Sequence, residues 1–396
     1  MQQAAGRVPR VLMVTGAFYP EMSSSAIQCR EMARLLGGRA RVHVLATAVD
    51  PALAADDTVD GVTVTRVVVD VTSTASKAGA TLRMVSALLR LLPRCDVVHL
   101  HGVSTKNVIV TALAKLFRRP IVLSLHTAGF DEAETVRGHG ALAWWAFTRA
   151  NRYLSVSSSL VDAYLAAGLP TERIQLVPNG IDVDRFRPAD PAERQSLRER
   201  LRLPGDLPVL LFVGFFSPDK QPRLLFDAWQ RLRQRGLETT VVFVGATRSS
   251  YFEVDDELAP VMRHDAAALG VEQRVVFAGA AHNVDEYFRA ADVFVLPSRR
   301  EGLPVALLEA MACALPCVAS RLAGSTDTII EHQKNGMLVP VGDVEALAHA
   351  LARLLSDPAL AALLGAAARQ TVVRRFANVD TADRWLDTYQ HVGVAG

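Results

Sequence analysis

Two glutamates, Glu301 and Glu309, stand at the ends of the segment EGLPVALLE, which lies between apolar runs typical of buried structure. Gly302 and Pro304 interrupt the chain after Glu301, and Pro304 suits the first position of a helix that runs to about Cys313. The free N–H groups at such a helix start, together with the positive end of the helix dipole, form an anion site. At a rise of about 1.5 Å per residue, the two carboxylates would lie roughly 10 Å apart.

This separation is long for a retaining glycosidase, in which the two carboxyl groups stand about 5–5.5 Å apart. It suits a ligand with hydroxyl groups at both ends and an anion in the middle, and a sugar diphosphonucleoside is such a ligand. The alternative is structural: Glu301 caps the helix at the surface and Glu309 forms a salt bridge. The segment by itself leaves both readings open.

Short β-branched runs alternate with segments of helical periodicity over most of the chain, and they predict the elements that position these glutamates. In the first half the expected strands are 10–15, 41–47, 96–100, 121–125 and 152–157, with helices near 26–37, 104–117 and 157–167. The rhythm restarts with strands 207–214, 239–245, 274–279, 292–298 and 315–320, and three helical stretches follow residue 343. Two successive runs of this kind predict an α/β protein with two doubly wound, Rossmann-like domains.

The domain boundaries follow from composition. A charged segment bounded by prolines, 189–208, is the expected hinge region. We expect an N-terminal acceptor-binding domain at 1–188, a C-terminal nucleotide-sugar-binding domain at 189–375, and a final helix at 376–396 that packs back on the N-terminal domain. Open parallel sheets bind ligands beyond the carboxyl ends of their strands, so a cleft between the two domains is the expected site.

The overall composition narrows the classes of function. The chain has 396 residues, which suits about two domains, and its 43 Lys+Arg against 41 Asp+Glu give a net charge of +2. No global field therefore points to nucleic acid. The four cysteines form no C-x-x-C pair, and no segment reaches 18 uninterrupted apolar residues. We expect a soluble cytoplasmic protein with free thiols, with the inner face of the membrane as an alternative location.

Three further blocks accompany the glutamate segment in a fixed order: LVPNGIDVDRFRP (176–188), LLFVGFFSPDKQPRLLFDAW (210–229) and VFAGAAHNVDEYFRAADVFVLPS (276–298). With SRREGLPVALLEAMACALPCVAS they resemble the retaining glycosyltransferases of family 4, also called the glycosyltransferase group 1 family. The resemblance covers about residues 10–343. It implies the GT-B fold, in which two Rossmann-like domains face each other across a cleft.

The resemblance implies roles for the residues that match the donor site. Glu309 would bind the ribose of the nucleotide, and Glu301 would contact the sugar that is transferred. The backbone amides of Gly302 and Leu303, before the helix that Pro304 opens, would meet the sugar and the phosphates. In this family the donor is a nucleotide-diphosphate sugar, and transfer keeps the anomeric configuration.

Two further matching residues carry a charge or a titratable ring. Lys220 matches the lysine that neutralises the diphosphate, and its compact point charge suits that role. His126, in LSLHTAGF, matches the histidine of the N-terminal domain that faces the reacting sugar. Without the resemblance, Lys220 reads as an exposed turn lysine and His126 as a structural histidine after a strand.

The sequence departs from the family pattern at two phosphate-binding positions. The family shows Gly-Arg before the lysine, but here Gly214 is followed by Phe215. Arg223, Arg299 or Arg300 substitutes for the missing cation, or the phosphates are held less tightly. The paired glycines after the first strand are replaced by serines, of which Ser24 and Ser25 can cap the next helix. A backbone with positive φ at Ser24 or Ser25 would be strained without glycine. The expected donor site still includes Gly214, Phe215, Ser24 and Ser25.

Three patterns invite other readings. Asp182 and Asp184 form D-x-D, but they lie in the NGIDVDRF block, which is structural in this family, so we expect no metal. His99 and His101 lack a carboxylate or cysteine partner at ligand spacing, so core packing and a place at the cleft edge are expected for them. No G-x-G-x-x-G occurs, and the fold therefore does not bring a dinucleotide cofactor with it. We expect no cofactor beyond the nucleotide-sugar substrate.

The expected activity is transfer of a sugar from a nucleotide-sugar donor to a hydroxyl group of a glycan, a lipid-linked or a small-molecule acceptor. The family implies a bacterial role in surface polysaccharide or glycoconjugate synthesis. A phosphorylase or epimerase of the same fold, or a non-catalytic sugar- or nucleotide-binding relative, is the alternative. Segment 77–96 has basic residues and leucines at helical spacing. It is either a peripheral membrane contact or an ordinary helix that covers a sheet with a solvated basic edge.

Overall fold

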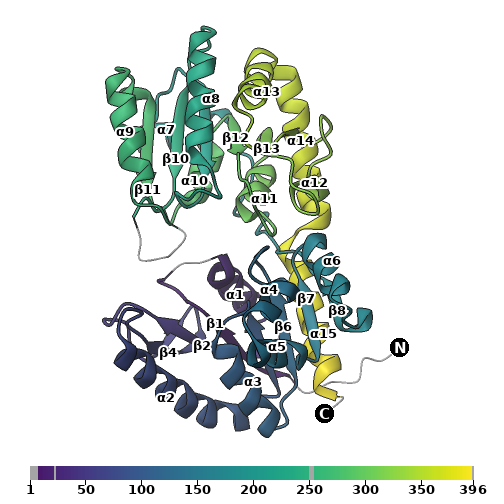
Figure 1. Ribbon diagram of the computed structural model, residues 1–396. Coiled ribbons are helices and arrows are strands. Elements are labelled where there is room, and N and C mark those ends of the chain that lie inside the picture. The colour runs from purple at the N-terminus through teal and green to yellow at the C-terminus, as the bar shows by residue number, and fades with distance from the viewer. Residues whose placement is uncertain (1–7, 22–23, 249–253, 395–396) are drawn as a thin grey trace. The chain divides into compact units, whose positions relative to one another are not determined.

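The computed structural model describes residues 8–21, 24–248 and 254–394. The chain forms two compact units, one of Met1–Gly180 with Asn378–Gly396 and one of Ile181–Ala377. We call these the first and the second unit. Each unit is built around a sheet that is largely or entirely parallel and has helices packed on it (Figure 1).

The sheet of the first unit has eight strands in the order β3-β4-β2-β1-β5-β6-β7-β8. All neighbours are parallel except β3 and β4. The strands are β1 (Arg10–Thr15), β2 (Arg41–Ala48), β3 (Asp56–Val59), β4 (Val62–Val68), β5 (Val97–His101), β6 (Ile121–Leu125), β7 (Arg152–Ser155) and β8 (Ile174–Leu176). The order runs outward in both directions from β1, which is the doubly wound arrangement, so the carboxyl ends of β1, β5 and β6 lie side by side.

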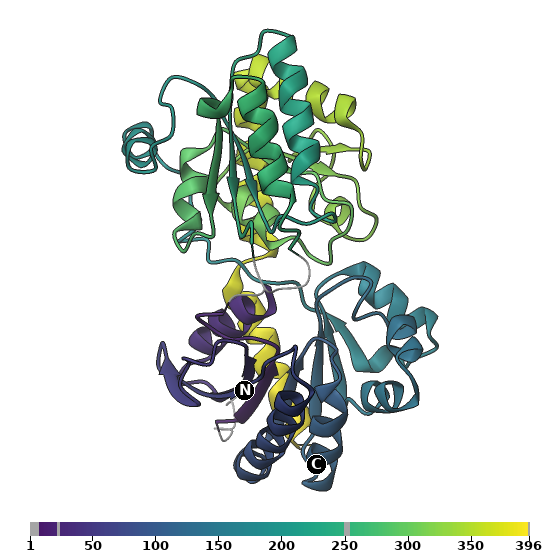
Figure 2. The same ribbon diagram turned by 60° about the vertical axis from the view of Figure 1, so that its left-hand side comes forward.

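The described residues of the first unit form the helices α1 (Ser24–Leu35), α2 (Thr74–Leu91), α3 (Lys106–Leu116), α4 (Ala133–Gly138), α5 (Ala141–Thr148), α6 (Ser158–Ala166) and α15 (Asn378–Val394). Helix α15, at the end of the chain, packs against α1 and β5, and both views show it running along this sheet (Figures 1 and 2). Its buried residues Ala382, Trp385, Tyr389 and Val392 recur every three or four positions and form one apolar stripe. This stripe places the chain's last helix in the core of the first unit.

The second unit has a six-stranded, fully parallel sheet in the order β11-β10-β9-β12-β13-β14. Its strands are β9 (Val209–Val213), β10 (Thr240–Val244), β11 (Val275–Gly279), β12 (Val293–Leu296), β13 (Cys317–Ser320) and β14 (Met337–Val339). Its helices are α7 (Pro191–Arg200), α8 (Pro222–Gln234), α9 (Leu258–Ala268), α10 (Val284–Ala290), α11 (Val305–Ala312), α12 (Thr326–Ile329), α13 (Val344–Ser356) and α14 (Pro358–Arg375). Short 3₁₀ turns cover Leu92–Arg94 and Thr171–Arg173 in the first unit and Glu272–Arg274 in the second.

Within the described ranges, no single helix is long and apolar enough to cross a membrane. One bent pair, α13 with α14, passes the same test of length and composition when the two helices are taken together, and the angle between them is 104°.

The strands expected from β-branched runs are confirmed to within a few residues, as are the three helices after residue 343. The short edge strands β3, β8 and β14 and the internal strand β4 were not predicted. The expected hinge at 189–208 is wrong, because these residues contain α7, which packs on α10. Asp190 caps α7 by accepting from Glu193 N at 2.8 Å, and Arg198 donates to Asp292 at 2.5 Å. A segment rich in charge was therefore a helix packed on α10 and not a linker.

The boundary between the units lies at Gly180 and Ile181, not at the expected 188 and 189. Ile181 N donates to Phe376 O at 2.8 Å, and the Arg369 guanidinium donates to Phe186 O at 2.8 Å. These contacts bind residues 181–188 to the second unit. Gly180 lies against Asn378, the first residue of α15, where the chain re-enters the first unit. An added Cβ on Gly180 would stand 2.3 Å from Asn378 Cα, so a side chain there would clash with α15.

Candidate functional site

In the second unit, Lys220 and Glu301 form an ion pair with each other. Lys220 lies in the loop after β9, and its Nζ donates to both carboxylate oxygens of Glu301, at 2.8 and 2.7 Å. The Glu301 side chain is only 6% exposed, and Ser298 Oγ donates to it at 2.7 Å. A carboxylate this buried is stable because it is paired and hydrogen-bonded. The structure thus joins two residues that the sequence assigned to different parts of a ligand, and adds Ser298, which the sequence analysis did not find.

The start of α11 supplies unpaired amides beside this ion pair. Pro304 is the N-cap residue and the first helical residue is Val305, so Pro304 lies one position before its expected place. Among the described residues, the N–H groups of Gly302, Leu303, Val305 and Ala306 have no hydrogen-bond acceptor. Free amides at a helix N-terminus favour negative charge, because their partial charges add to the helix dipole. The amides are thus free to bind an anion, and the anion site itself stays a prediction.

Glu309 lies on the second turn of α11, as expected. Its carboxyl group has no hydrogen-bond or ion-pair partner in the part of the chain that the structure describes. Burial raises its pKa to about 8, while Arg185 lowers it and Asp285 raises it further. Between its ordinary pKa and about 8 the folded state binds more protons than the unfolded state, so this group destabilises folding progressively as the pH rises through that window. The expected salt bridge of the structural reading is absent, and the group is available to a ligand.

The loop after β9 carries no cation at the position where arginine was expected. Phe215 is half-buried there, and the neighbouring Phe216 is fully buried among Phe212 and Phe243 in the aromatic core. The loop lies close to the end of β10: a Cβ on Gly245 would stand 1.9 Å from the Gly214 carbonyl oxygen, and Gly245 has φ of +146°. Only glycine permits that approach.

The three arginines considered as substitutes all pair with carboxylates. Arg223, on α8, donates to Asp227 at 2.8 Å and also to Asp265. Arg300 donates to Asp219, the residue before Lys220, and Arg299 lies 3.6 Å from the same carboxylate. Arg299 and Arg300 thus flank the loop that carries Lys220, whereas Arg223 is held by other acids. A phosphate could reach the first two only in competition with Asp219.

In the first unit, His126 follows β6 and is held through its backbone by Asp131. Asp131 is buried; its Oδ2 accepts from the N–H groups of His126 and Thr127 at 2.7 and 2.9 Å, and its Oδ1 accepts from Val103 N at 2.8 Å. One carboxylate therefore ties together the loops that follow β5 and β6. Burial raises the pKa of Asp131, and the three amides act against that rise. Sequence periodicity carried no signal for this residue.

His126 belongs to a row of three histidine rings. His126 stacks on His101 with ring centroids 5.7 Å apart, and His101 lies 4.3 Å from His99. His99 is fully buried, with its ring nitrogens bonded to Tyr389 Oη and Ser124 Oγ, which confirms the expected core packing. Both ring nitrogens of His101 and Nε2 of His126 lack a partner in the described ranges. Burial lowers the pKa of His99 to about 3 and of His126 to about 4, and that of His101 well below its ordinary value, so all three rings are neutral at pH 7.

This row of histidines is expected to make the first unit acid-sensitive. Below pH 6.5 the unfolded chain binds protons that the folded rings reject, so stability is lost as the pH falls toward 4, by up to about 1.4 kcal/mol per pH unit for each histidine. Urea unfolding followed at several pH values measures this slope. His126→Gln should remove the contribution of one histidine to this slope. An unchanged slope in His126→Gln would contradict the assignment.

The other predicted residues are placed as follows. Ser24 and Ser25 open α1, but their side chains lie outside the described structure. Asp182 accepts from the N–H groups of Asp184 and Arg185 and so caps a turn, as a structural D-x-D would. Within the residues described, no group of three or more His, Cys, Asp or Glu side chains is arranged to hold a metal ion. Metal independence stays a prediction.

Segment 77–96 forms most of α2 and the turn after it. Met84 and Leu88 are buried against the sheet, whereas Leu82 and Leu89 are exposed. Arg90 pairs with Asp56 at 3.0 Å. The buried face fits a helix that covers the sheet, and a membrane contact through this helix stays a prediction.

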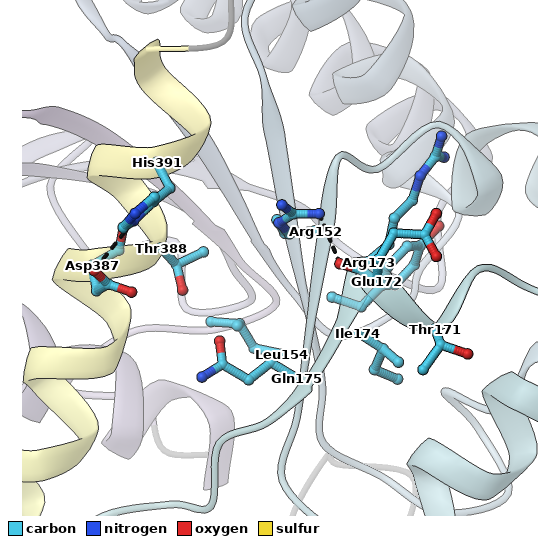
Figure 3. A pocket seen from close by; sticks show the side chains of 11 residues that line it. Arg152, Leu154, Thr171, Glu172, Arg173, Ile174, Gln175, Asp387, Thr388 and His391 are labelled. Carbon is cyan, nitrogen blue, oxygen red and sulfur yellow. Dashed lines mark hydrogen bonds and ion pairs between the residues drawn. The ribbon is translucent and has the colours of Figure 1, made fainter.

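Two cavities lie near the amino ends of β7 and β8, whereas His126 follows the carboxyl end of β6. One of about 350 Å³ lies between β7, β8 and α15 (Figure 3), where Arg152 donates to Glu172 O and His391 pairs with Asp387. The other, of about 580 Å³, is lined by Lys115, Trp145, Thr148, Arg149, Ala150, Asn151 and Arg173. Neither contains a residue predicted from the sequence.

Comparison with known proteins identifies the family. Residues 25–185 match the family described as Glycosyltransferase Family 4, and residues 193–371 match Glycosyl transferases group 1. A GDP-mannose-dependent alpha-(1-6)-phosphatidylinositol monomannoside mannosyltransferase of Mycolicibacterium smegmatis is 36% identical over 209 residues, 50% of this chain and 52% of that protein. A D-inositol 3-phosphate glycosyltransferase of Xylanimonas cellulosilytica is 35% identical over 227 residues, 56% of this chain and 52% of that protein. The chain thus spans about half the length of these curated relatives.

Solved structures agree on the fold. The crystal structure of Anabaena HepE in complex with UDP and glucose superposes with a TM-score of 0.78, covers 97% of this chain and 100% of its own, and is 21% identical in sequence. The two Rossmann-like units are those of GT-B glycosyltransferases. Two family matches that together span most of the chain, and the same two-unit fold, lead to one conclusion: the chain belongs to the glycosyltransferases of family 4, the glycosyltransferase group 1 family.

Proposed function

We propose that this protein is a retaining glycosyltransferase, which moves a sugar from a nucleotide-diphosphate sugar to a hydroxyl group of an acceptor. The observation that carries the proposal is the grouping of unpartnered Glu309, the Lys220–Glu301 pair and the free amides of α11 in one loop-and-helix segment of the second unit. A ribose diol can donate to Glu309, and a diphosphate can accept from the amides and from Lys220. The remaining carboxylate, Glu301, then faces the hydroxyl groups of the sugar.

The reaction breaks the bond between the anomeric carbon and the phosphate oxygen and forms a bond from that carbon to the acceptor oxygen. Negative charge develops on the leaving diphosphate, and Lys220 and the α11 amides stabilise that charge more in the transition state than in the bound donor. We propose attack from the same face, with the leaving phosphate taking the proton of the acceptor hydroxyl, which keeps the anomeric configuration. No metal or further cofactor is proposed.

Donor binding requires that Lys220 exchange part of its ion pair for phosphate. Glu301 holds Lys220 in place before the donor binds, so little of the lysine's conformational freedom is lost on binding. Glu301 keeps its bond from Ser298 when Lys220 turns to the phosphate. The pair is therefore proposed as a preorganised cation and not as a fixed structural bridge.

The names of the relatives support a proposal for the acceptor and for the cellular location of the enzyme. One relative's name specifies phosphatidylinositol monomannoside and another's inositol 3-phosphate, so the names span a lipid-linked and a small phosphorylated acceptor. We propose a glycan, lipid-linked or small-molecule acceptor in surface polysaccharide or glycoconjugate synthesis, at the cytoplasmic side of the membrane. His126 is proposed to face the reacting sugar as a neutral ring.

A thermal-shift panel of UDP, GDP, ADP, TDP and their common sugar conjugates tests the proposal. One nucleotide should stabilise the wild type, by about 2.7 kcal/mol at a hundredfold excess over its Kd. Glu309→Gln should lose most of this shift, and Glu345→Gln, an exposed residue of α13 in the same unit, should keep it. No shift with any nucleotide would overturn the proposal in favour of a non-catalytic relative that has lost its diphosphate site.

Calorimetry adds a second readout that follows from the pKa of Glu309. The free group is mostly protonated at pH 7, but ribose hydroxyl groups donate to a carboxylate, so binding should release a proton. The measured enthalpy should therefore depend on the ionisation enthalpy of the buffer in the wild type and not in Glu309→Gln. Buffer-independent enthalpies in the wild type would remove Glu309 from the ribose site.

A further inference from the structure

Lys106, in the first unit, is a partly buried cation without a counter-ion. It is the first residue of α3, and its Nζ donates to Thr15 O at 2.7 Å and lies 3.5 Å from Thr47 Oγ1. Thr15 is the last residue of β1, and Thr47 is close to the end of β2. Among residues 8–21, 24–248 and 254–394, no carboxylate lies within ion-pair distance of Lys106. The lysine thus stands at the carboxyl edge of the sheet with only neutral oxygens around its charge.

Unpaired backbone donors lie beside this cation. The N–H groups of Gly16, Ala17 and Phe18, which follow β1, have no acceptor in the described part of the chain. Lys106 Nζ would lie 3.9 Å from a Cβ placed on Gly16, so the amide row starts next to the ammonium group. The carbonyl oxygen of Gly16 is occupied, because Thr47 Oγ1 donates to it. The three unpaired N–H groups therefore add donors next to the ammonium group.

Burial without a counter-ion has a measurable consequence. It lowers the pKa of Lys106 to about 8, because the charged form loses water and gains no opposite charge in exchange. Lys220 and Lys334 differ in this respect, because they pair with glutamates. Lys115, at the far end of α3, donates to the neutral Asn151, and burial together with Arg149 and Arg173 lowers its pKa as well. An anion at Lys106 would restore the missing partner.

We infer that Lys106 and the amides of Gly16–Phe18 bind a phosphate group carried by the acceptor substrate. A lysine and consecutive backbone amides together form a site for a tetrahedral oxyanion. The site lies in the same unit as His126, and β1 is two strands from β6 in the sheet. At about 4.8 Å between neighbouring strands, the phosphate would lie about 10 Å from the His126 loop, within reach of a hydroxyl group on the same small phosphorylated acceptor or lipid headgroup. The inference rests on the proposed function and names the acceptor's chemical class.

The small number of lysines allows direct observation of the site. The chain has five, at 77, 106, 115, 220 and 334, so reductive methylation with ¹³C-formaldehyde gives five dimethyl-lysine signals beside that of the N-terminal amine, and each lysine keeps its charge. Lys106→Arg and Lys115→Arg assign the two lysines of α3. Inorganic phosphate should shift the Lys106 signal and raise its apparent pKa from about 8, because the anion favours the charged form, while the Lys115 signal stays unchanged. A Lys106 signal insensitive to phosphate, or an equal response at Lys115, would overturn the inference.

Unmodified variants provide the second measurement. Lys106→Met should weaken phosphate binding, measured by calorimetry, by about tenfold or more, as expected for loss of a charge-assisted hydrogen bond. Lys115→Met is the matched control on the same helix and should bind phosphate like the wild type. If phosphate binding is lost in Lys115→Met instead, the anion belongs to the cavity that Lys115 lines and the inference fails.

Nucleotide binding separates the acceptor from the donor as the source of the phosphate. Lys106→Met should keep the wild-type thermal shift with the nucleotide diphosphate, because Lys106 is not among the residues proposed to bind the donor. Loss of that shift would assign Lys106 to the donor diphosphate and overturn the inference while the proposed function stands. If the wild type binds no nucleotide but still binds phosphate at Lys106, the proposed function fails and the anion site does not.

Once the donor and the acceptor are identified, KM values for each of them provide a specific test. Lys106→Met should raise KM for a phosphorylated acceptor and leave KM for the donor unchanged. With an acceptor that lacks the phosphate, the variant should have the same KM as the wild type. A uniform fall in kcat with both acceptors would mean that Lys106 only supports the fold, and would contradict the inference.

Discussion

Replacing Lys220 by methionine is expected to lower turnover roughly 10²- to 10³-fold, the range seen when one preorganised donor to developing negative charge is removed. In the proposed reaction the charge develops on the leaving diphosphate, and Lys220 is held by Glu301, the residue that directly precedes the segment with the α11 amides. Methionine keeps the length and apolar stem of the side chain and removes only its charge and donors. Steady-state kinetics with the donor identified by the nucleotide panel measures the effect.

The same substitution is also expected to destabilise the second unit, and the two effects must be separated. Without Lys220, the Glu301 carboxylate is buried with Ser298 as its hydrogen-bond partner, and breaking a buried pair in this way costs about 3–5 kcal/mol. The cost should lie at or below the lower end of that range, because the lysine is one-quarter exposed. Urea unfolding of the single variant measures it.

A double variant distinguishes catalysis from folding. Lys220→Met combined with Glu301→Gln replaces the stranded carboxylate by a neutral amide, so stability should return while turnover stays low. Lys334→Met is the control: its pair with Glu331 is exposed on both sides and is worth little, so neither stability nor turnover should change. Recovery of turnover together with stability in the double variant would show that Lys220 acts on the fold and not on the leaving group.

Asp131→Asn is expected to destabilise the first unit and to lower turnover through His126. The carboxylate accepts on both oxygens, from Val103 on one side and from His126 and Thr127 on the other. An asparagine must present its NH₂ group to one side, so at least one buried amide loses its acceptor, at a cost of roughly 1–3 kcal/mol for each amide. The isosteric change leaves packing intact and isolates this effect.

The two outcomes of Asp131→Asn are measured independently. Urea unfolding should show the loss of stability, and kinetics should show a fall in kcat larger than any change in donor KM, because the loop that carries His126 moves while the second unit is untouched. Asp162→Asn, an exposed residue of α6, should change neither. A stable Asp131→Asn with normal turnover would mean that His126 does not depend on this anchor, and that the histidine row alone holds the ring.

Much of the fold was predictable because parallel strands buried on both faces read as unbroken β-branched runs. The missed strands β3, β8 and β14 have three or four residues and lie at the edges of their sheets, too short for a clear pattern. Strand β4, with seven residues between β3 and β2, is a β-branched run that the prediction overlooked. Helix α7 was missed because its charged residues resembled a linker. Its partners, such as Asp292 for Arg198, are far away in the sequence, so no local pattern could reveal them.

The sequence by itself determined the two-sheet architecture, the family and the segment with Glu301, the α11 amides and Glu309, because these depend on periodicity and on residues that are neighbours along the chain. Only the tertiary structure paired Lys220 with Glu301, 81 positions apart, and set Lys106 against Thr15, 91 positions apart. It also joined two loops through Asp131 and returned α15 to the first unit. Such pairings depend on strand order and on which charges lose water, and both are properties of the folded chain.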